Sequence, residues 1–252
     1  MQIYIVTITD GNIDALECTL QSIDEQNDNH FKNLVISKEK LKNLKKKFQT
    51  KKRIFIYKKN STIYEAMNIG LKKTKNNCVI FLNAGDKFYS ASSLKMIFYY
   101  LKKTHFKTCL MFISILDYKN NYFIPKKEVF FSSNFLTHSS FIRPKAKKDF
   151  GFDIKSKITA DGEWMRNNTA KFNVTKIYAP LSIFSLGGIS NFPSKKSMIM
   201  KINRGIVEIS KELLKFILLK IVGVNLFYKI IYYFKYNKID YGDIKKFCKE
   251  NN

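Results

Sequence analysis

A carboxylate directly after a predicted buried strand is the first feature of this sequence that could do chemistry. The apolar run Cys78–Leu82 predicts a strand, which continues into Asn83, Ala84, Gly85 and Asp86. In open parallel sheets, ligands bind in the crevice at the carboxyl ends of the strands. Asp86 is therefore a candidate ligand-binding residue, although an Asp after a Gly is equally typical of a simple turn.

A second candidate carboxylate is Asp161, which precedes Gly162, Glu163 and Trp164. This segment predicts the start of a helix, and Asp is one of the residues favoured as a helix N-cap. A capping role and a chemical role for Asp161 do not exclude each other.

The elements that must position these residues follow an alternating pattern through the first hundred residues. Strand-like runs alternate with helical periodicity, which is typical of βαβ units and a parallel sheet. In the segment Ser61–Leu71, a capping box of Thr62 and Glu65 predicts a helix start. Predicted strands are Gln2–Thr9, Leu34–Ser37, Arg53–Tyr57 and Cys78–Leu82, with a crossover helix over Ile13–Ile23. Beyond Asp86 we expect a helix near Ser92–Lys103 and strands near Thr108–Leu116, Asn121–Ile124 and Leu136–Ile142.

Composition excludes several classes of protein. The 252 residues carry 45 Lys plus Arg against 20 Asp plus Glu, a net charge of +25, and 45% are hydrophobic. So much apolar material excludes a disordered basic tail, and the length fits one large α/β domain with or without a helical appendage. The four cysteines form no C-x-x-C pair, which argues against a zinc site or a disulfide framework. The N-terminus is typical of a strand rather than a signal peptide, which predicts a cytoplasmic protein.

The C-terminal region predicts an amphipathic helix that begins at about Arg204 and breaks near Gly223. One face of this helix carries Arg204, Glu208, Lys211 and Lys215, and the opposite side carries Ile206, Ile209, Leu213, Phe216 and Ile217. Apolar burial combined with Lys charge favours peripheral binding to an anionic membrane surface. The alternatives are packing of the helix on the rest of the chain or a homodimer contact.

Three short motifs together resemble glycosyltransferase family 2. They are I-Y-E-A-M-N-I-G at Ile63–Gly70, F-L-N-A-G-D at Phe81–Asp86 and I-T-A-D at Ile158–Asp161. Close relatives in that family have approximately I-Y-D-A-M-N-x-G, F-L-N-S-G-D and I-A-A-D, in the same order and at similar spacing. The resemblance covers about residues 1 to 190.

The resemblance implies an α/β GT-A fold, which is Rossmann-like with a mostly parallel central sheet flanked by helices. We expect a catalytic domain over residues 1–200 and a C-terminal helical, membrane-associating segment over residues 201–252. The implied activity is inverting, metal-dependent transfer of a sugar from a nucleotide-diphosphate sugar, with UDP-sugar favoured over GDP-sugar. The implied acceptor is a glycan or a lipid-linked saccharide in bacterial surface polysaccharide or lipopolysaccharide synthesis, at the inner face of the cytoplasmic membrane.

The resemblance also assigns roles to individual residues. Asp86 matches the aspartate that binds Mn²⁺ or Mg²⁺, a Lewis acid for the leaving diphosphate, and Asp161 matches the general base. The residues implied at the donor site are Thr9, Asn60, Tyr64, Asn68, Asn83 and His138.

The sequence departs from the family pattern at several positions. The second strand ends in Ser37 and Lys38 instead of the Asp that reads the nucleotide base, and Asn60 and Gly85 replace acids. Gly187–Ser190 resembles a loop that closes over the diphosphate, or is simply a tight turn.

Two other functions are compatible with parts of this sequence. The high positive charge with many Tyr and Phe residues is compatible with nucleic-acid binding, but no recognised nucleic-acid-binding motif accompanies it. A catalytically degenerate transferase that acts as a scaffold is the third hypothesis, because the base-reading Asp is missing.

Overall fold

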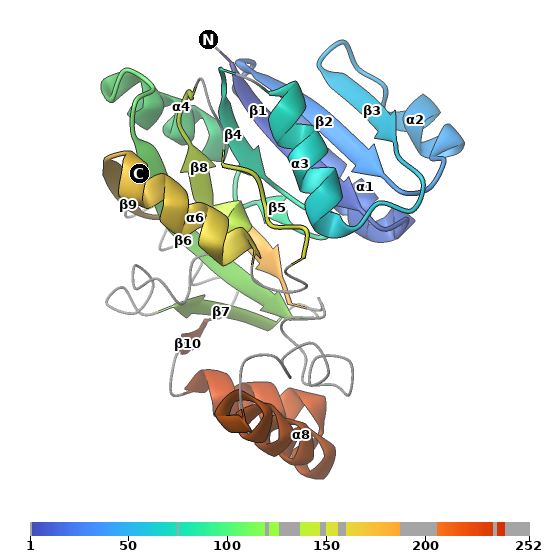
Figure 1. Cartoon of the computed structure of the whole chain (residues 1–252), viewed down its shortest axis with the longest axis vertical. Coiled ribbons are helices and arrows are strands. Elements are labelled where there is room, and N and C mark those ends of the chain that lie inside the picture. Colours follow the sequence, from blue (N-terminus) through green and yellow to red (C-terminus); the bar gives the residue numbers. More distant parts are fainter. Residues whose placement is uncertain are drawn as a thin grey trace.

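The computed structural model describes residues 2–74, 76–118, 121–125, 137–146, 150–155, 160–186, 206–233 and 236–239. Within these residues, ten strands form one sheet, with helices on both of its faces (Figure 1). This architecture confirms the predicted α/β class with a C-terminal helical extension.

The N-terminal half is the parallel unit that the sequence predicts. Strands β1 (Ile3–Thr9), β2 (Phe31–Ser37), β3 (Arg53–Tyr57) and β4 (Cys78–Phe81) pair in parallel in the order β4-β1-β2-β3. The connections are α1 (Ile13–Asp24), α2 (Lys42–Phe48) and α3 (Ile63–Lys73). Because the chain returns from β3 across β1 to β4, the direction of winding switches between β1 and β4, where ligands bind in such sheets.

Local sequence explains where these helices begin and which side they bury. The Asn12 side chain accepts a hydrogen bond from the N–H of Ala15 at the start of α1, and Thr62 and Glu65 form the expected capping box of α3. Helix α2 buries Leu44 and Phe48, while its four lysines are exposed. The lysines of α2 therefore belong to a solvated helix face.

The second half of the sheet is mostly antiparallel. Its elements are β5 (Lys87–Phe88), α4 (Ser93–Lys103), β6 (Cys109–Tyr118), β7 (Asn121–Pro125), η1 (His138–Ser140), β8 (Phe141–Arg143), α6 (Ala160–Lys171) and β9 (Val174–Ser185). Strand β8 is antiparallel to β4 and β6, and β9 is parallel to β6. The expected strand over Leu136–Ile142 was wrong in part: His138–Ser140 form a 3₁₀ turn, and Leu136 lies outside the described residues.

The C-terminal region contains α8 (Ile206–Tyr233) and β10 (Tyr236–Ile239). The break predicted in α8 is present at Gly223, whose φ of 71° and ψ of 168° are not helical. Strand β10 pairs with β7 in antiparallel fashion, so this region is not helical throughout. Arg204 and the proposed boundary near residue 200 lie outside the described residues. In the part of the chain that is described, no helix has both the length and the apolar character needed to cross a bilayer.

The core lies on both faces of the sheet because side chains alternate along β1. Ile3 and Ile5 belong to the cluster that includes α1 and α4, whereas Val6 and Ile8 belong to the cluster that includes α3 and α6. Figure 1 shows α3 and α6 in front of the sheet. β1 is thus the strand on which both layers of the fold meet.

We predict that Gly70→Ala destabilises the fold by about 1–3 kcal/mol, the usual cost of overpacking. A Cβ at Gly70 would lie 2.6 Å from Val6 Cγ1, and Val6 is fully buried in β1. Urea denaturation measures the change. The control is Gly162→Ala, since its Cβ would approach nothing closer than 3.7 Å. Equal stability of the two variants would contradict the close approach of α3 to β1.

Candidate active site

A buried carboxylate and imidazole form the centre of the site. Asp86 Oδ2 lies 2.9 Å from His138 Nε2, and Asp86 Oδ1 accepts a hydrogen bond of 3.0 Å from the backbone N–H of Ser185. Asp86 is only 3% exposed. This one side chain therefore ties together the loop after β4, the η1 turn and the end of β9.

Helix α1 fixes the loop that carries Asp86. The N–H of Gly85 donates to Thr19 Oγ1 at 2.9 Å and to the carbonyl of Ala15 at 3.0 Å, and Thr19 Oγ1 donates to the Asp86 carbonyl at 2.8 Å. Gly85 has a φ of +100°, a conformation that favours glycine. The glycine that replaces an acid of the family motif is thus required by the backbone here.

Buried hydroxyl groups hold the η1 turn against the sheet. Ser139 Oγ lies 3.1 Å from Thr137 Oγ1 and 3.4 Å from Ser114 Oγ, which accepts a hydrogen bond of 2.9 Å from Ser182. Since Ser114 belongs to β6 and Ser182 to β9, the turn is anchored to two strands. The position of His138 follows from this anchoring.

The charge of His138 is set by two carboxylates. Burial lowers the pKa of the imidazole, but the carboxylates of Asp161, 4.0 Å from Nδ1, and Asp86, 2.9 Å from Nε2, outweigh it and raise the pKa to about 9. At neutral pH the side chain is therefore an imidazolium that lies between the two acids.

Asp161 is the more accessible of these two acids. Its side chain is 32% exposed, its Oδ1 accepts a hydrogen bond from the N–H of Gly162 at 3.0 Å, and the Tyr64 hydroxyl donates to Oδ1 across 3.5 Å. Burial, and then the charge of Asp161, hold the pKa of Tyr64 well above its usual range, so that Tyr64 remains a neutral donor. Asp161 is not the N-cap, because α6 begins one residue earlier, at Ala160.

An aromatic cluster packs against Tyr64 and lies next to Asp161. Trp164, 1% exposed, stacks on Phe152 with ring centroids 4.9 Å apart and contacts Phe81 and Phe141 edge-on. Phe152 also stacks on Tyr64 at 5.9 Å. The cluster therefore joins α6 to α3 beneath the two functional groups.

Asn68 lies in this supporting layer. Its amide donates to the carbonyl of Phe152 at 2.9 Å and accepts from the N–H of Phe152 at 2.7 Å, which copies the pairing of two strands. The structure does not bring the Asn68 side chain to Asp86, and its role at the donor site remains a prediction.

The other predicted donor-site residues are placed as follows. Thr9 is buried at the end of β1, where its Oγ1 accepts a hydrogen bond of 3.1 Å from the N–H of Gly11. Asn83 lies in the Asp86 loop, and its Oδ1 is buried without a hydrogen-bond partner. Asn60 is exposed after β3 with a φ of 57°. The structure thus joins His138, Asp86, Asp161 and Tyr64 in one chain of contacts, but no such contact includes Thr9 or Asn60.

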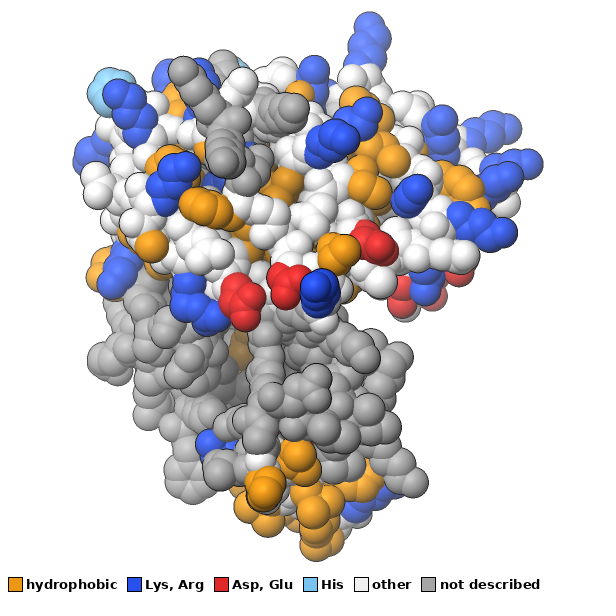
Figure 2. Space-filling view, viewed as in Figure 1, with side chains coloured by type: hydrophobic (Ala, Val, Ile, Leu, Met, Phe, Trp, Pro, Cys, Tyr) orange, Lys and Arg blue, Asp and Glu red, His pale blue; other side chains and the backbone are white. Residues whose placement is uncertain are grey.

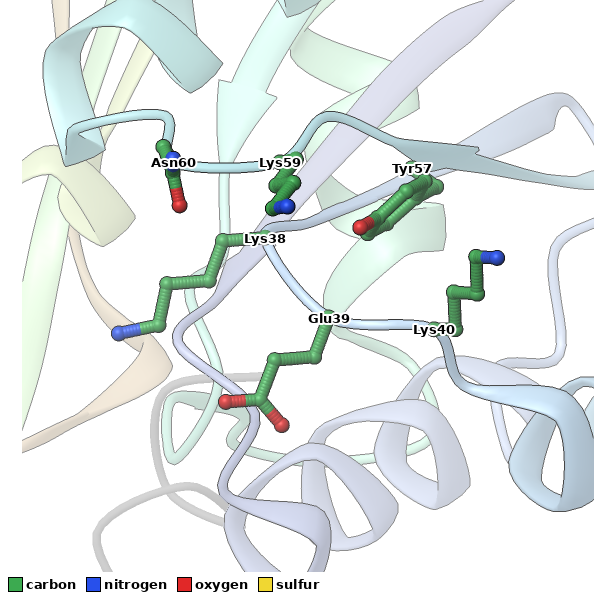
Figure 3. A pocket seen from close by; sticks show the side chains of 6 residues that line it. All are labelled: Lys38, Glu39, Lys40, Tyr57, Lys59 and Asn60. Atoms are coloured by element: carbon green, nitrogen blue, oxygen red, sulfur yellow. The ribbon is translucent and has the colours of Figure 1, made fainter.

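Two open pockets lie beyond the carboxyl ends of β2 and β3. The first, about 460 Å³, is lined by side chains from the end of β3 and from the loops after these two strands (Figure 3): Lys38, Glu39, Lys40, Tyr57, Lys59 and Asn60. The second, about 480 Å³, adjoins the first through Lys59 and Asn60 and is also lined by Lys58, Ser61, Glu65, Asn68, Ile69 and Ile154. Both pockets are basic, as a site for an anion would be.

Glu39 lies where the loops after β1 and β2 meet. A Cβ at Gly11, which has a φ of +106°, would lie only 2.5 Å from the Glu39 carboxylate carbon. Although β2 itself ends in Ser37, an acid two residues later therefore reaches the crevice beside β1. From the sequence alone, only the absence of Asp at the end of β2 is visible.

Each oxygen of Asp86 already accepts one hydrogen bond from the protein, and a metal on Oδ2 would share that oxygen with the His138 imidazolium. Among the residues that the structure describes, no three His, Cys, Asp or Glu side chains cluster. The role of Asp86 as a metal ligand therefore stays a prediction, in which the phosphates of the donor supply further ligands. Ile158, Thr159 and Gly187–Ser190, which complete the family motifs, lie outside the described residues.

Comparison with known proteins shows similarity at the level of structure. No protein-family model matches the chain, and no curated protein matches it closely. S. aureus TarS 1–349 in complex with UDP-GlcNAc superposes with a TM-score of 0.63 and 14% identity over 75% of this chain and 59% of the TarS 1–349 chain. The mannosyltransferase PcManGT from Pyrobaculum calidifontis, in complex with GDP-Man and Mn²⁺, gives 0.57 and 10% over 79% of this chain and 60% of its own.

These similarities define the class of fold. A second TarS 1–349 structure, in complex with UDP, gives a TM-score of 0.63 at 13% identity over 85% of this chain and 66% of that one. The chain thus spans less than two thirds of the length of each of these structures. It has a fold that is found in glycosyltransferases.

We predict strong energetic coupling between Asp86 and His138. Asp86→Ala removes the nearer of the two carboxylates that pair with the buried imidazolium and should cost about 3–5 kcal/mol. In a double-mutant cycle with His138→Ala, the coupling energy should be roughly 1–3 kcal/mol, measured by chemical denaturation. Asp28 and His30 form a matched control pair with the same chemistry at 3.0 Å, but the His30 side chain is 61% exposed. Their coupling should be about 0–1 kcal/mol, and equal coupling of the two pairs would contradict the central role of Asp86.

Proposed function

We propose that this protein is a family 2 glycosyltransferase that transfers a sugar from a nucleotide sugar to an acceptor hydroxyl with inversion. The observation that carries the proposal is Asp161, a partly exposed carboxylate held between Tyr64 and His138 in a fold shared with a mannosyltransferase. TarS with UDP-GlcNAc supports a UDP-sugar donor, and PcManGT with GDP-Man supports a GDP-sugar as the alternative.

In the proposed reaction, Asp161 accepts the proton of the acceptor hydroxyl. The acceptor oxygen forms its bond to the anomeric carbon as the bond from that carbon to the diphosphate oxygen breaks, and the nucleoside diphosphate leaves with the electron pair. A general base in this position typically contributes 10²- to 10⁴-fold to the rate. Tyr64, kept neutral by burial and by the nearby charge, donates toward Asp161 and orients the carboxylate.

His138 is proposed to reduce the repulsion between the carboxylates of Asp86 and Asp161. Two carboxylates in one partly buried site repel each other, and the imidazolium between them offsets this repulsion. Because the η1 turn fixes His138, the imidazolium also limits how far Asp161 can move. His138 therefore acts as a positioning residue.

The nucleotide is proposed to occupy the crevice beside Glu39 and the two basic pockets. The positive charges of Lys38 and Lys59 attract the diphosphate. The Glu39 carboxylate, next to Gly11, can accept hydrogen bonds from a ribose or a base. In this proposal Glu39 replaces the Asp that is missing at the end of β2, and Asn60, exposed in both pockets, contacts the donor.

Use of Mn²⁺ or Mg²⁺ remains a prediction for the donor complex, and PcManGT with Mn²⁺ supports it. The contact between Asp86 Oδ2 and His138 Nε2 would have to weaken or break before Asp86 could contribute that oxygen to a metal. No step of the proposed reaction depends on such a change.

The biological setting is also a proposal. A glycan or lipid-linked saccharide acceptor, a role in surface polysaccharide or lipopolysaccharide synthesis, and location at the inner face of the cytoplasmic membrane remain as predicted from the sequence. Nucleic-acid binding gains no support, since the similar structures are TarS with UDP-GlcNAc and a mannosyltransferase with GDP-Man. Turnover of a nucleotide sugar would eliminate the scaffold hypothesis.

We predict that Asp161→Asn lowers kcat for sugar transfer by roughly 10²-fold or more, because the amide cannot accept the proton. Donor binding should be retained. The exposed neighbours provide matched controls as Asp153→Asn and Glu163→Gln, which should keep near wild-type rates. If Asp161→Asn is as active as the wild type, the base lies elsewhere.

We predict that Glu39→Gln weakens nucleotide binding by roughly 10-fold or more, since an acceptor that is charged is replaced by one that is neutral. A thermal-shift titration with UDP, GDP and their sugars measures this, because ligands that bind the folded state raise its stability. Running the titration with Mn²⁺ and with EDTA tests the metal prediction in parallel. Exposed Glu25→Gln is the control. Identical affinities of the two variants would remove Glu39 from the donor site.

A further inference from the structure

Helix α8 has one face that is held by the rest of the protein. Phe227, 2% exposed, packs in a cluster with Leu116 of β6, Phe123 of β7 and Leu186. The α8 residues Leu218, Leu219 and Val222 pack against the same cluster. These contacts fix the orientation of the helix, so the opposite side must point away from the protein.

The opposite side is apolar and exposed over four turns. We call it the outer face, and it consists of Ile206 (81% exposed), Leu213 (45%), Leu214 (68%), Ile217 (45%) and Ile221 (76%). The spacing of these residues follows the 3.6-residue repeat of a helix. Figure 2 shows hydrophobic side chains gathered over α8 at the lower end of the molecule. A continuous apolar face of this kind marks an interaction site.

Exposed lysines lie beside the outer face and around the rest of the helix. At 3.6 residues per turn, Lys220 follows one edge of the face, whereas Lys211 and Lys215 lie further round, toward the opposite side of the helix, and all three are exposed. The one acidic side chain that the structure describes in α8, Glu212, is buried on the inner side at 3% exposure. The surroundings of the apolar face are therefore positive, in a chain with a net charge of +25.

We propose that the outer face of α8 docks on an anionic phospholipid bilayer, with the helix lying in the interface. An apolar face on a helix that also carries exposed lysines is the arrangement that interfacial helices use, since the apolar side chains enter the acyl boundary and the lysines reach anionic headgroups. The straight part before Gly223 is about 25 Å long at 1.5 Å per residue.

Charge favours a lipid surface over a second copy of this chain. A two-fold contact through the outer face would bring Lys220 and the other lysines of one copy close to those of the other. Glu212 offsets only part of this charge, since its carboxylate lies 3.8 Å from Lys215 Nζ, on the side of the helix away from the outer face. An anionic bilayer supplies the complementary charge along the whole helix.

The same helix lies close to the candidate active site. Phe184 of β9 packs with the α8 cluster and also contacts the His138 ring, with centroids 5.3 Å apart. Docking through α8 therefore holds the site near the membrane surface. This inference rests on the proposed function in one respect: the acceptor that such docking favours is a saccharide on a membrane lipid.

The test is sedimentation of the full-length protein with vesicles of phosphatidylglycerol and phosphatidylcholine, compared with pure phosphatidylcholine. Binding should require phosphatidylglycerol and should weaken as salt rises. Ile221→Glu places a charge in the outer face and should reduce binding at least 10-fold. Tyr99→Glu, at a 61% exposed position of α4, is the matched control and should bind like the wild type. Lys220→Glu provides a second variant with the apolar face intact, and it should lower binding at low salt.

The outcomes separate docking from catalysis. Failure of the full-length protein to bind anionic vesicles would overturn the proposal, as would equal binding of Ile221→Glu and Tyr99→Glu. A dimer that ultracentrifugation detects and Ile221→Glu abolishes, without vesicle binding, would assign the face to a second copy. Ile221→Glu should transfer sugar to a soluble acceptor at the wild-type rate. Vesicle binding that is lost in Ile221→Glu, in a protein with no transfer activity, would support docking and refute the proposed function.

Discussion

The ion pair between Asp86 and His138 is the interaction on which the arrangement of the site depends. Its two partners come from segments 52 residues apart, and a third segment, the end of β9, joins them through the N–H of Ser185. Burying a charged pair has a desolvation cost that only good geometry and further hydrogen bonds can offset. Here the Ser185 N–H and the nearby Asp161 provide those further interactions. The pair therefore stabilises one relative position of three segments rather than simply adding to the free energy of unfolding.

Around this pair, the two halves of the sheet supply different parts of the site. The parallel half ends in loops that form the basic pockets and the Glu39 crevice, whereas the antiparallel half supplies His138 and the β9 end. Asp86 follows β4, the last strand of the parallel half, and β4 pairs with β8 across the junction. The proposed donor and acceptor sides would thus meet where the two strand patterns join.

Much of this arrangement could be predicted from local sequence. The four N-terminal strands and the capped start of α3 are visible as apolar runs and a Thr62–Glu65 pair, because burial and capping leave regular patterns. The family resemblance also pointed to Asp86, His138, Tyr64 and Asp161, which the structure joins in one chain of contacts.

Contacts that backbone groups make, and contacts between residues far apart in the sequence, could not be predicted. No periodicity reveals that Phe152 bonds to Asn68 across 84 residues, or that Trp164 supports the site from below. For the same reason, the sequence around Asp86 does not show that both of its oxygens accept hydrogen bonds from distant segments.

The bond between Asp86 and β9 also has a consequence for how this protein can vary. Its donor is a main-chain amide, which every residue except proline possesses, so the identity of residue 185 leaves no trace of the contact in a sequence. Size is constrained at the facing position instead, since a Cβ at Gly85 would lie 3.2 Å from Ser185 Cβ. Among natural variants, position 185 should therefore exclude proline, and position 85 should keep glycine.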